Sequence, residues 1–183
     1  MNLVIVNGLP AVGKSYLASE LSKLLGLPCL KKDEIKEFVF DSLGTKDRDW
    51  SRQVGMASMD FLHSVVEVAV ENDVSIIVES AFFNEISKPK FEKILSSGRV
   101  NCVEVYCKAN SDVRRKRFID RSESGVRHKG HVDSLSIIEE EESELLERYA
   151  PLRLGTLIEI DTTDFSSVNP AAIAEQVQSG LSI

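Results

Sequence analysis

The sequence predicts an α/β fold in which helices cover both faces of a five-stranded parallel sheet. Two observations predict it. Short runs of apolar, often β-branched residues alternate along the chain with segments of helical periodicity. The first of these runs ends in a glycine-rich loop that leads straight into a helical segment. In such folds ligands bind at the carboxyl ends of the strands, so we expect the functional residues at that edge of the sheet.

The composition fits one domain over residues 1–183, because 43% of the residues are hydrophobic and 28% are charged, as in ordinary globular proteins. The apolar runs are far shorter than the roughly 20 residues that span a bilayer, so we expect no membrane contact. The net charge of −7 disfavours a long polyanion as partner. The cysteines, Cys29, Cys102 and Cys107, form no CxxC pair, and the N-terminus lacks the features of a signal peptide. We therefore expect a cytoplasmic protein.

The first strand is expected over residues 3–6, a continuous apolar run that fits a strand buried on both faces. The helix after it has apolar residues at helical spacing from Leu17 to Leu25, and Gly26 ends the pattern. Residues 28–32 form a short, weak strand candidate. The alternation nevertheless requires a second strand at that place.

The rest of the chain continues the alternation between apolar runs and helical spacing. The later strands are expected over residues 76–78, 100–106 and 157–160. The later helices are expected over residues 35–39, 54–69, 90–95, 112–121, 137–149 and 170–177, of which 112–121 is basic and 137–149 acidic. No linker or internal repeat interrupts this order, which supports a single domain.

The loop after the first strand matches the pattern GxxxxGKS, whose glycines let the backbone turn tightly and direct its N–H groups toward an anion. Its residues are Gly8, Leu9, Pro10, Ala11, Val12, Gly13, Lys14 and Ser15, and Tyr16 follows them in the expected nucleotide site. In this motif Lys14 reaches the β and γ phosphates during catalysis, and the Ser15 hydroxyl ligates Mg²⁺. The sequence therefore predicts a three-layer P-loop NTPase fold that binds a nucleotide.

Two carboxylates follow expected strands. Asp33 comes after the second strand, where it could accept the proton of an attacking hydroxyl and help to hold Mg²⁺ through water. It could also merely cap a helix that starts at Glu34. Glu79 ends the third strand, where an acidic residue commonly organises the metal shell, and it could also be a capping or substrate-binding residue.

Arginines gather near the middle of the chain. Arg114, Arg117 and Arg121 lie at three- and four-residue steps, which places them on one face of the basic helix. The irregular stretch after it adds Arg127 and neighbouring histidines. A solvated basic face would explain the run, but arginines also neutralise a phosphoryl group in transfer. We favour a short arginine-rich lid over approximately residues 121–134, which would also exclude water.

The order of these motifs resembles that of the small phosphate-loop kinases that include chloramphenicol phosphotransferase, gluconate kinase and the kinase domain of polynucleotide 5′-kinase. The similarity extends over most of the chain. The matching segments are the phosphate loop and residues 32–35, 79–83, 117–121 and 127–131. The resemblance implies an adenylate kinase-like fold.

The resemblance also implies roles for single residues. Asp33 matches the aspartate that activates the acceptor hydroxyl, and Arg121 matches the lid arginine on the transferring phosphate, with Arg127 as a second catalytic candidate. Arg117 matches the arginine that lies against adenine. The third-strand acid of the family is usually aspartate, so Glu79 departs from the pattern.

Our leading hypothesis is a kinase that transfers the γ-phosphoryl group of ATP, with Mg²⁺, to a hydroxyl of a small molecule. One alternative is a polynucleotide 5′-hydroxyl kinase, and another is a nucleotide-dependent switch that hydrolyses its nucleotide slowly. We expect a monomer or a homodimer. The acceptor, which the sequence does not name, should bind between residues 34 and 84. Candidates for lining its pocket are Phe38, Arg48, Trp50, Arg52 and Met56, with Phe82, Phe83 and Asn84 opposite.

Overall fold

The computed structural model describes residues 1–96, 99–125, 127–132 and 141–181. Five parallel strands form one sheet in the order β2-β3-β1-β4-β5. The strands are β1 (Asn2–Gly8), β2 (Cys29–Lys31), β3 (Ile76–Glu79), β4 (Asn101–Lys108) and β5 (Thr156–Asp161). The five-stranded parallel sheet predicted from the sequence is confirmed, including its weak second strand.

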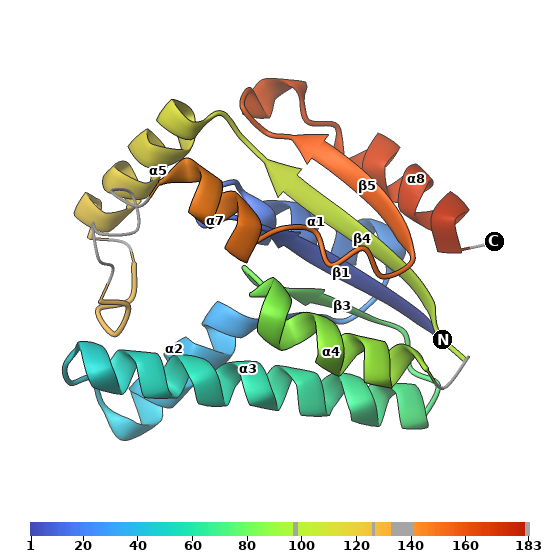
Figure 1. Cartoon of the computed structure of the whole chain (residues 1–183), viewed down its shortest axis with the longest axis horizontal. Helices are drawn as coiled ribbons and strands as arrows, with labels where there is room; N and C mark the ends of the chain where they lie inside the picture. The colour runs from blue at the N-terminus through green and yellow to red at the C-terminus, as the bar shows by residue number, and fades with distance from the viewer. Residues whose placement is uncertain (97–98, 126, 133–140, 182–183) are drawn as a thin grey trace.

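Helices cover both faces of this sheet (Figure 1). They are α1 (Lys14–Leu25), α2 (Lys32–Leu43), α3 (Arg48–Glu71), α4 (Asn84–Leu95), α5 (Ser111–Glu123), α7 (Glu142–Arg148) and α8 (Pro170–Leu181), with a short 3₁₀ helix, η1 (Phe165–Ser167). The expected acidic helix over 137–149 is described only from its α7 part, because its first residues lie outside the described ranges.

The helix after β2 differs from the expectation. α2 has 12 residues and begins at Lys32, directly after the last residue of β2. The prediction from apolar spacing was shorter, because polar residues occupy the first turn of α2. Asp33 therefore lies inside that first turn, and the residue at the cap position is Lys31. The interpretation of Asp33 as a cap before Glu34 is wrong.

The two faces of β1 build two apolar cores. Val4 and Val6 pack into a core with α1 and α8, whereas Leu3 and Ile5 pack into a core with α3 and α4. All four side chains are fully buried. A strand buried on both faces can hold the loop at its carboxyl end rigidly, because neither side of the strand moves freely.

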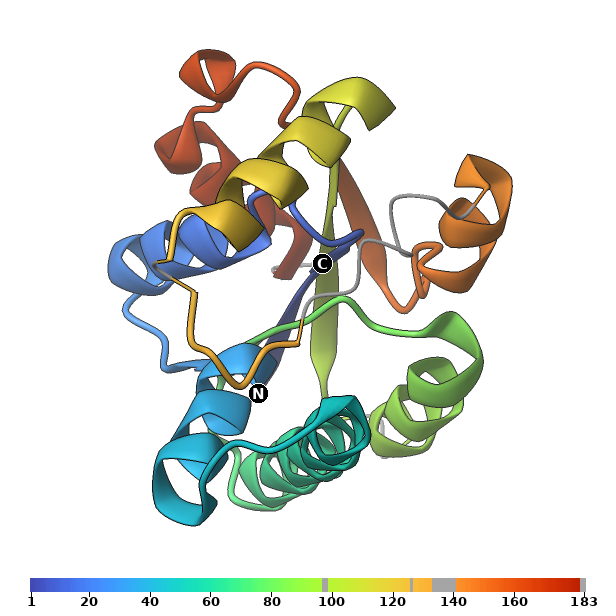
Figure 2. The same ribbon diagram turned by 90° about the vertical axis from the view of Figure 1, so that its left-hand side faces the viewer.

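The loops that carry the predicted site meet at the carboxyl edge of the sheet. In Figure 1 this edge lies at the left, where the segment after α5 descends toward α2 and α3. Figure 2 shows the same segment passing from the end of α5 across to these two helices. Within the described part of the chain, no helix combines the length and the apolar character needed to cross a membrane.

Candidate functional site

The phosphate loop connects β1 to α1 through unusual backbone angles. Gly8 and Gly13 have φ values of 136° and 86°, a region that favours glycine. A side chain at Gly8 would also collide with the Cys107 carbonyl, because a Cβ atom there would lie 2.1 Å from its oxygen. These two glycines allow the loop to curl at the start of α1, where helix N–H groups attract anions.

The Lys14 side chain folds back over the loop. Its ammonium donates a hydrogen bond of 2.7 Å to the Leu9 carbonyl oxygen. Burial lowers the pKa of Lys14, although the nearby Glu79 carboxylate opposes that change. A buried ammonium beside backbone N–H groups is suited to bind an anion, because the negative charge of the anion compensates the charge of the ammonium.

Ser15 and Glu79 lie side by side beneath this loop. The Ser15 hydroxyl donates a hydrogen bond of 3.0 Å to Oε2 of Glu79, which ends β3. Burial raises the pKa of Glu79, and the Lys14 charge opposes that rise. Mg²⁺ in nucleotide sites prefers one or two protein oxygens together with phosphate oxygens. The pair fits that chemistry, and the described residues contain no larger cluster of metal-ligating side chains.

A buried pair that the sequence analysis missed supports the loop from behind. Asn7 Oδ1 accepts hydrogen bonds from the backbone N–H groups of Gly8 (2.7 Å) and Phe82 (3.1 Å). Asn7 in turn donates a hydrogen bond of 2.9 Å to Glu104 Oε1. Glu104 is fully buried and also accepts from the backbone of Leu152 and Arg153. These bonds join the phosphate loop, the chain after β3 and the chain before β5.

The chain after β5 packs against the other side of the loop. The Phe165 ring lies so close to Gly13 that a Cβ atom there would be 1.9 Å from its Cζ. The Arg117 guanidinium lies 4.6 Å over the same ring and donates a hydrogen bond to the Thr163 carbonyl. The Tyr16 ring meets Phe165 edge-on. Arg117 and Tyr16 thus lie together beside the loop, with Phe165, which no sequence motif marks.

Asp33 lies between two cations. Its Oδ1 is 3.0 Å from the Lys32 ammonium, and its Oδ2 is 3.6 Å from the Arg127 guanidinium. Burial alone would raise the pKa of Asp33, but Lys32, His131 and Arg127 together hold it well below its usual range. The group is therefore a stable carboxylate in contact with Lys32 and Arg127, and its charge also affects Glu79 and Lys14.

Residues 127–131, which we call the lid segment, are docked on α2 and α3. The Ser51 hydroxyl of α3 donates a hydrogen bond of 2.8 Å to the Gly130 carbonyl. Gly130 lies against the Phe40 ring of α2, where a Cβ atom would be 2.1 Å from the ring. The His128 ring stacks on the same phenylalanine at 5.6 Å. His131 Nε2 lies 2.8 Å from Glu37 Oε1.

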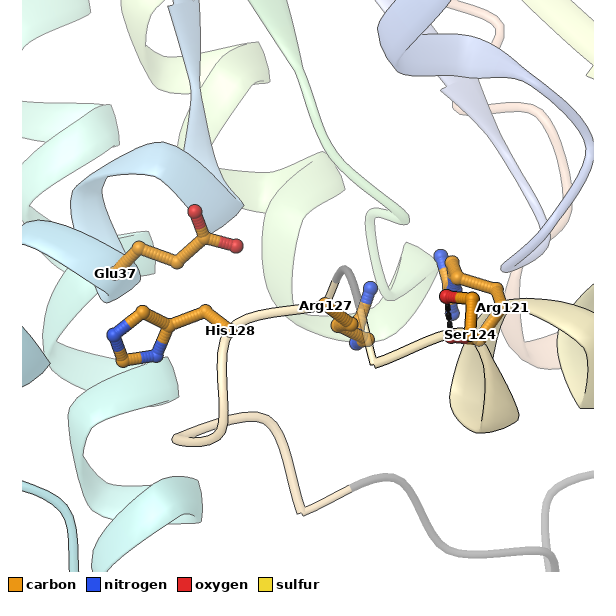
Figure 3. A pocket seen from close by; sticks show the side chains of 5 residues that line it. All are labelled: Glu37, Arg121, Ser124, Arg127 and His128. Atoms are coloured by element: carbon orange, nitrogen blue, oxygen red, sulfur yellow. Dashed lines mark hydrogen bonds between the residues drawn. The ribbon is translucent and has the colours of Figure 1, made fainter.

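A cavity of about 630 Å³ opens between α2 and the end of α5. It is lined by Glu37, Arg121, Ser124, Arg127 and His128. Figure 3 shows Glu37 and His128 on one side, Arg121 and Ser124 on the other, and Arg127 between them. Arg121 lies in the last part of α5, so the predicted lid begins with helical residues. The charge of Arg121 also affects Lys14, which places it near the phosphate loop.

Several predicted side chains lie elsewhere. Arg114 does not share the site of Arg121, because it is 1% exposed and its Nη2 lies 2.7 Å from Glu142 of α7. Phe82 lies in the core. The amide of Asn84 donates to the Ala150 and Pro151 carbonyls. Phe38 and Met56, two of the candidates for lining the acceptor pocket, are exposed on the surface.

Comparisons with known proteins agree with this architecture. The model of the family AAA_33, an AAA domain, matches residues 3–139, which is more than half of the chain. No curated protein sequence matches significantly. A protein from Chloroflexus aurantiacus J-10-fl described as a "putative kinase" is 34% identical in sequence; the match covers 98% of this chain and 97% of that chain, with a TM-score of 0.87.

More distant structures share the fold alone. A gluconokinase from Sinorhizobium meliloti 1021 is 17% identical, with 99% of this chain and 91% of that chain covered and a TM-score of 0.55. A shikimate kinase from Bacteroides thetaiotaomicron is 12% identical, with 99% and 98% covered and a TM-score of 0.58. By the family match and by the resemblance that its motifs predicted, this chain belongs to the AAA_33 family, within the small phosphate-loop kinases.

Proposed function

We propose that the protein is an ATP-dependent kinase that transfers the γ-phosphoryl group to a hydroxyl of a small molecule. The observation that carries the proposal is the position of Asp33, a carboxylate between the phosphate loop and the lid segment. It contacts Arg127, which lines the cavity, and its charge also affects Lys14. A donor site for ATP and a carboxylate for an acceptor hydroxyl therefore share one edge of the sheet.

The donor half would be formed by the loop from Gly8 to Ser15. Its backbone N–H groups and Lys14 would hold the phosphates, and Arg117 with Tyr16 would lie beside the base. Ser15 and Glu79 would hold Mg²⁺, which neutralises charge on the β and γ phosphates. We assign the metal to this pair, because Asp33 contacts Lys32 and Arg127 instead.

The acceptor half would be organised by Asp33. The acceptor hydroxyl oxygen attacks the γ phosphorus, the bond to the bridging β,γ oxygen breaks, ADP leaves, and the hydroxyl proton passes to Asp33. A carboxylate of low pKa suits this task, because in a loose transition state it mainly orients the nucleophile. When Arg127 turns toward the phosphoryl group, Asp33 loses a cationic neighbour and its proton affinity rises.

The arginines and the lid segment would complete the site. Arg121 and Arg127 line one cavity and can reach a phosphoryl group that spreads charge over its equatorial oxygens. The lid segment is anchored by Ser51 and Phe40, and its closure over a bound acceptor would exclude water from the site. Limited water favours transfer to the acceptor over hydrolysis of ATP.

Two variants test the proposal. Lys14→Ala should abolish turnover while the protein still folds, whereas the exposed Lys93→Ala should not. Asp33→Asn should lower kcat at least about 100-fold and leave ATP binding intact. Unchanged activity in Lys14→Ala would refute the assignment. Loss of ATP binding in Asp33→Asn would show that Asp33 binds the donor and is not the base.

A screen of ATP consumption identifies the acceptor class. It should include sugars, other metabolite hydroxyls, antibiotics and 5′-hydroxyl oligonucleotides, each with and without the protein. Turnover only with oligonucleotides, weakening steeply with salt, would favour a polynucleotide kinase. Slow hydrolysis without any acceptor, stimulated by a protein partner, would favour a switch.

A further inference from the structure

Three carboxylates follow one another on the side of α2 that meets the lid segment. Asp33, Glu37 and Asp41 lie at four-residue steps, which places them on one face of the helix. Their partners in the lid segment are, in the same order, Arg127 at 3.6 Å, His131 at 2.8 Å and His128 at 3.2 Å. Of these three carboxylates, Glu37 is the one that lines the cavity.

His131 fixes the orientation of the Glu37 carboxylate. The His131 side chain is 2% exposed, and its Nε2 lies 2.8 Å from Oε1 of Glu37. Burial lowers the pKa of His131 to about 3, so the ring is neutral near pH 7 and its Nε2–H donates to the carboxylate. Among the described residues, none donates a hydrogen bond to Oε2 of Glu37, and 38% of this side chain is exposed. Oε2 can therefore accept a hydrogen bond from a ligand in the cavity.

Asp33 and Glu37 are close enough for one small molecule to contact both. Residues four apart on a helix have Cβ atoms about 5–6 Å apart. Figure 3 shows the Glu37 side chain on the α2 side of the cavity and Arg127, the partner of Asp33, in the middle. Burial and the charge of Asp33 both raise the pKa of Glu37. A ligand hydroxyl that donates to Oε2 would stabilise the charged form of Glu37, which burial disfavours.

The charges of the cavity indicate which chemical group suits Glu37. An anionic group would be repelled by the Glu37 carboxylate itself. A cationic group would attract Glu37, but it would also lie beside Arg121 and Arg127, which line the same cavity. A hydroxyl carries no charge and can donate its proton to Oε2 without either repulsion. The cavity therefore favours a hydroxyl at this place.

We propose that Glu37 binds a second hydroxyl of the acceptor, while Asp33 binds the hydroxyl that is phosphorylated. The acceptor is then a polyhydroxy compound, such as a sugar or a polyol, with both hydroxyls on the same ring or short carbon chain. This inference rests on the proposed kinase function and extends it to the substrate class. Glu37 belongs to no sequence motif, although it lies within residues 34–84, where the acceptor was expected.

Matched substrates test the second hydroxyl. Sugars and short polyols are compared with their monodeoxy counterparts, in which hydrogen replaces one hydroxyl other than the phosphorylated one, and ADP release is measured. Removing the hydroxyl that Glu37 binds should lower kcat/KM at least about 10-fold, because a hydrogen bond to a charged group is lost. Amino analogues, in which an ammonium replaces that hydroxyl, should be no better than the deoxy compounds. A preference for the amino analogues would overturn the assignment of a hydroxyl.

Matched variants test the residue. Glu37→Ala should raise KM for the polyhydroxy acceptor roughly 10- to 100-fold, with KM for ATP unchanged. The polyhydroxy and monodeoxy acceptors should then have nearly equal kcat/KM, whereas a role of Glu37 in lid docking alone would lower both values by the same factor. Asp41→Ala is the matched control, because Asp41 also contacts the lid segment, through His128, but does not line the cavity. It should leave the discrimination between the two acceptors unchanged.

The outcomes separate the two proposals. Equal kcat/KM for polyhydroxy compounds and all of their monodeoxy counterparts, or a discrimination that survives in Glu37→Ala, overturns the Glu37 site and leaves the kinase proposal standing. The same holds if Asp41→Ala removes the discrimination as completely as Glu37→Ala does. No ATP-dependent phosphorylation of any hydroxyl compound overturns the kinase function and this inference with it. A discrimination that is lost in Glu37→Ala and kept in Asp41→Ala supports the inference.

Discussion

Replacing Glu104 by glutamine should destabilise the protein, because three hydrogen bonds converge on this buried carboxylate. Oε1 accepts from Asn7 Nδ2 and the Leu152 backbone at 2.9 Å each, and Oε2 accepts from the Arg153 backbone at 2.8 Å. Glutamine offers one oxygen and one NH₂ group. If its oxygen keeps the first two bonds, the NH₂ group must face the Arg153 N–H, and two donors are left opposed.

The structure gives the magnitude of this change. One charge-assisted hydrogen bond is lost and a buried donor is left without an acceptor, which together cost about 3 kcal/mol of unfolding free energy. For a chain of this size that loss lowers Tm by roughly 6 to 12 °C. The ATP affinity should also fall several-fold, since a neutral amide oxygen holds Asn7 more weakly than the carboxylate does and Asn7 fixes the Gly8 backbone.

Denaturant unfolding followed by circular dichroism, together with a nucleotide titration, measures both effects in Glu104→Gln. The control is Glu159→Gln on β5, whose half-exposed carboxylate lies 3.8 Å from Lys108 and should change stability by less than about 0.5 kcal/mol. If Glu104→Gln is as stable as this control, the buried network does not hold the phosphate loop, and the reasoning is wrong.

Three further predictions concern residues inside the fold. Burial lowers the pKa of His63 to about 4. The unfolding free energy should therefore be constant above pH 6.5 and fall by up to about 3 kcal/mol as the pH approaches 4, because the unfolded state then binds a proton that the folded state does not. Denaturant titrations at pH 7.5 and 4.5 should show a smaller loss of unfolding free energy in His63→Leu than in the original protein. Gly13→Ala should cost about 2 kcal/mol or more and abolish ATP binding, because its φ is 86° and its new methyl collides with Phe165; normal calorimetric ATP binding would contradict this. Arg114→Met should cost no more than about 1 kcal/mol, because the Glu142 side chain is one-third exposed and water can solvate it when its partner is removed; a large fall in kcat with so small a change in Tm would return Arg114 to the site.

The fold was predictable because it follows from patterns that are local in the sequence. The apolar runs and the glycine loop over residues 8–15 need only their neighbours to be interpreted, and they indicated the strands and the loop. The weak strand at 28–32 was predicted from its place in the alternation. The length of α2 was underestimated, because its first turn is polar and carries site residues.

The support of the site was not predictable in the same way. Asn7 and Glu104 are 97 residues apart, and nothing near either residue indicates the other. Phe40 and Gly130 are likewise far apart in the sequence, and their contact depends on how the lid segment docks on α2. Helical spacing placed Arg114 with the other arginines, but spacing does not show which face a later helix covers.

The position of β1 has a consequence for how such a protein can diversify. β1 lies at the centre of the sheet and pairs with both β3 and β4, so its amides should exchange hydrogen slowly and its loop should tolerate few substitutions. The three-residue β2 is an edge strand, and it leads into the α2–α3 hairpin at the periphery. Under the proposed function, mutations in that hairpin would alter the choice of acceptor without disturbing how the protein holds a nucleotide. New acceptor preferences would then arise by substitutions in one half of the site while the other half keeps its sequence.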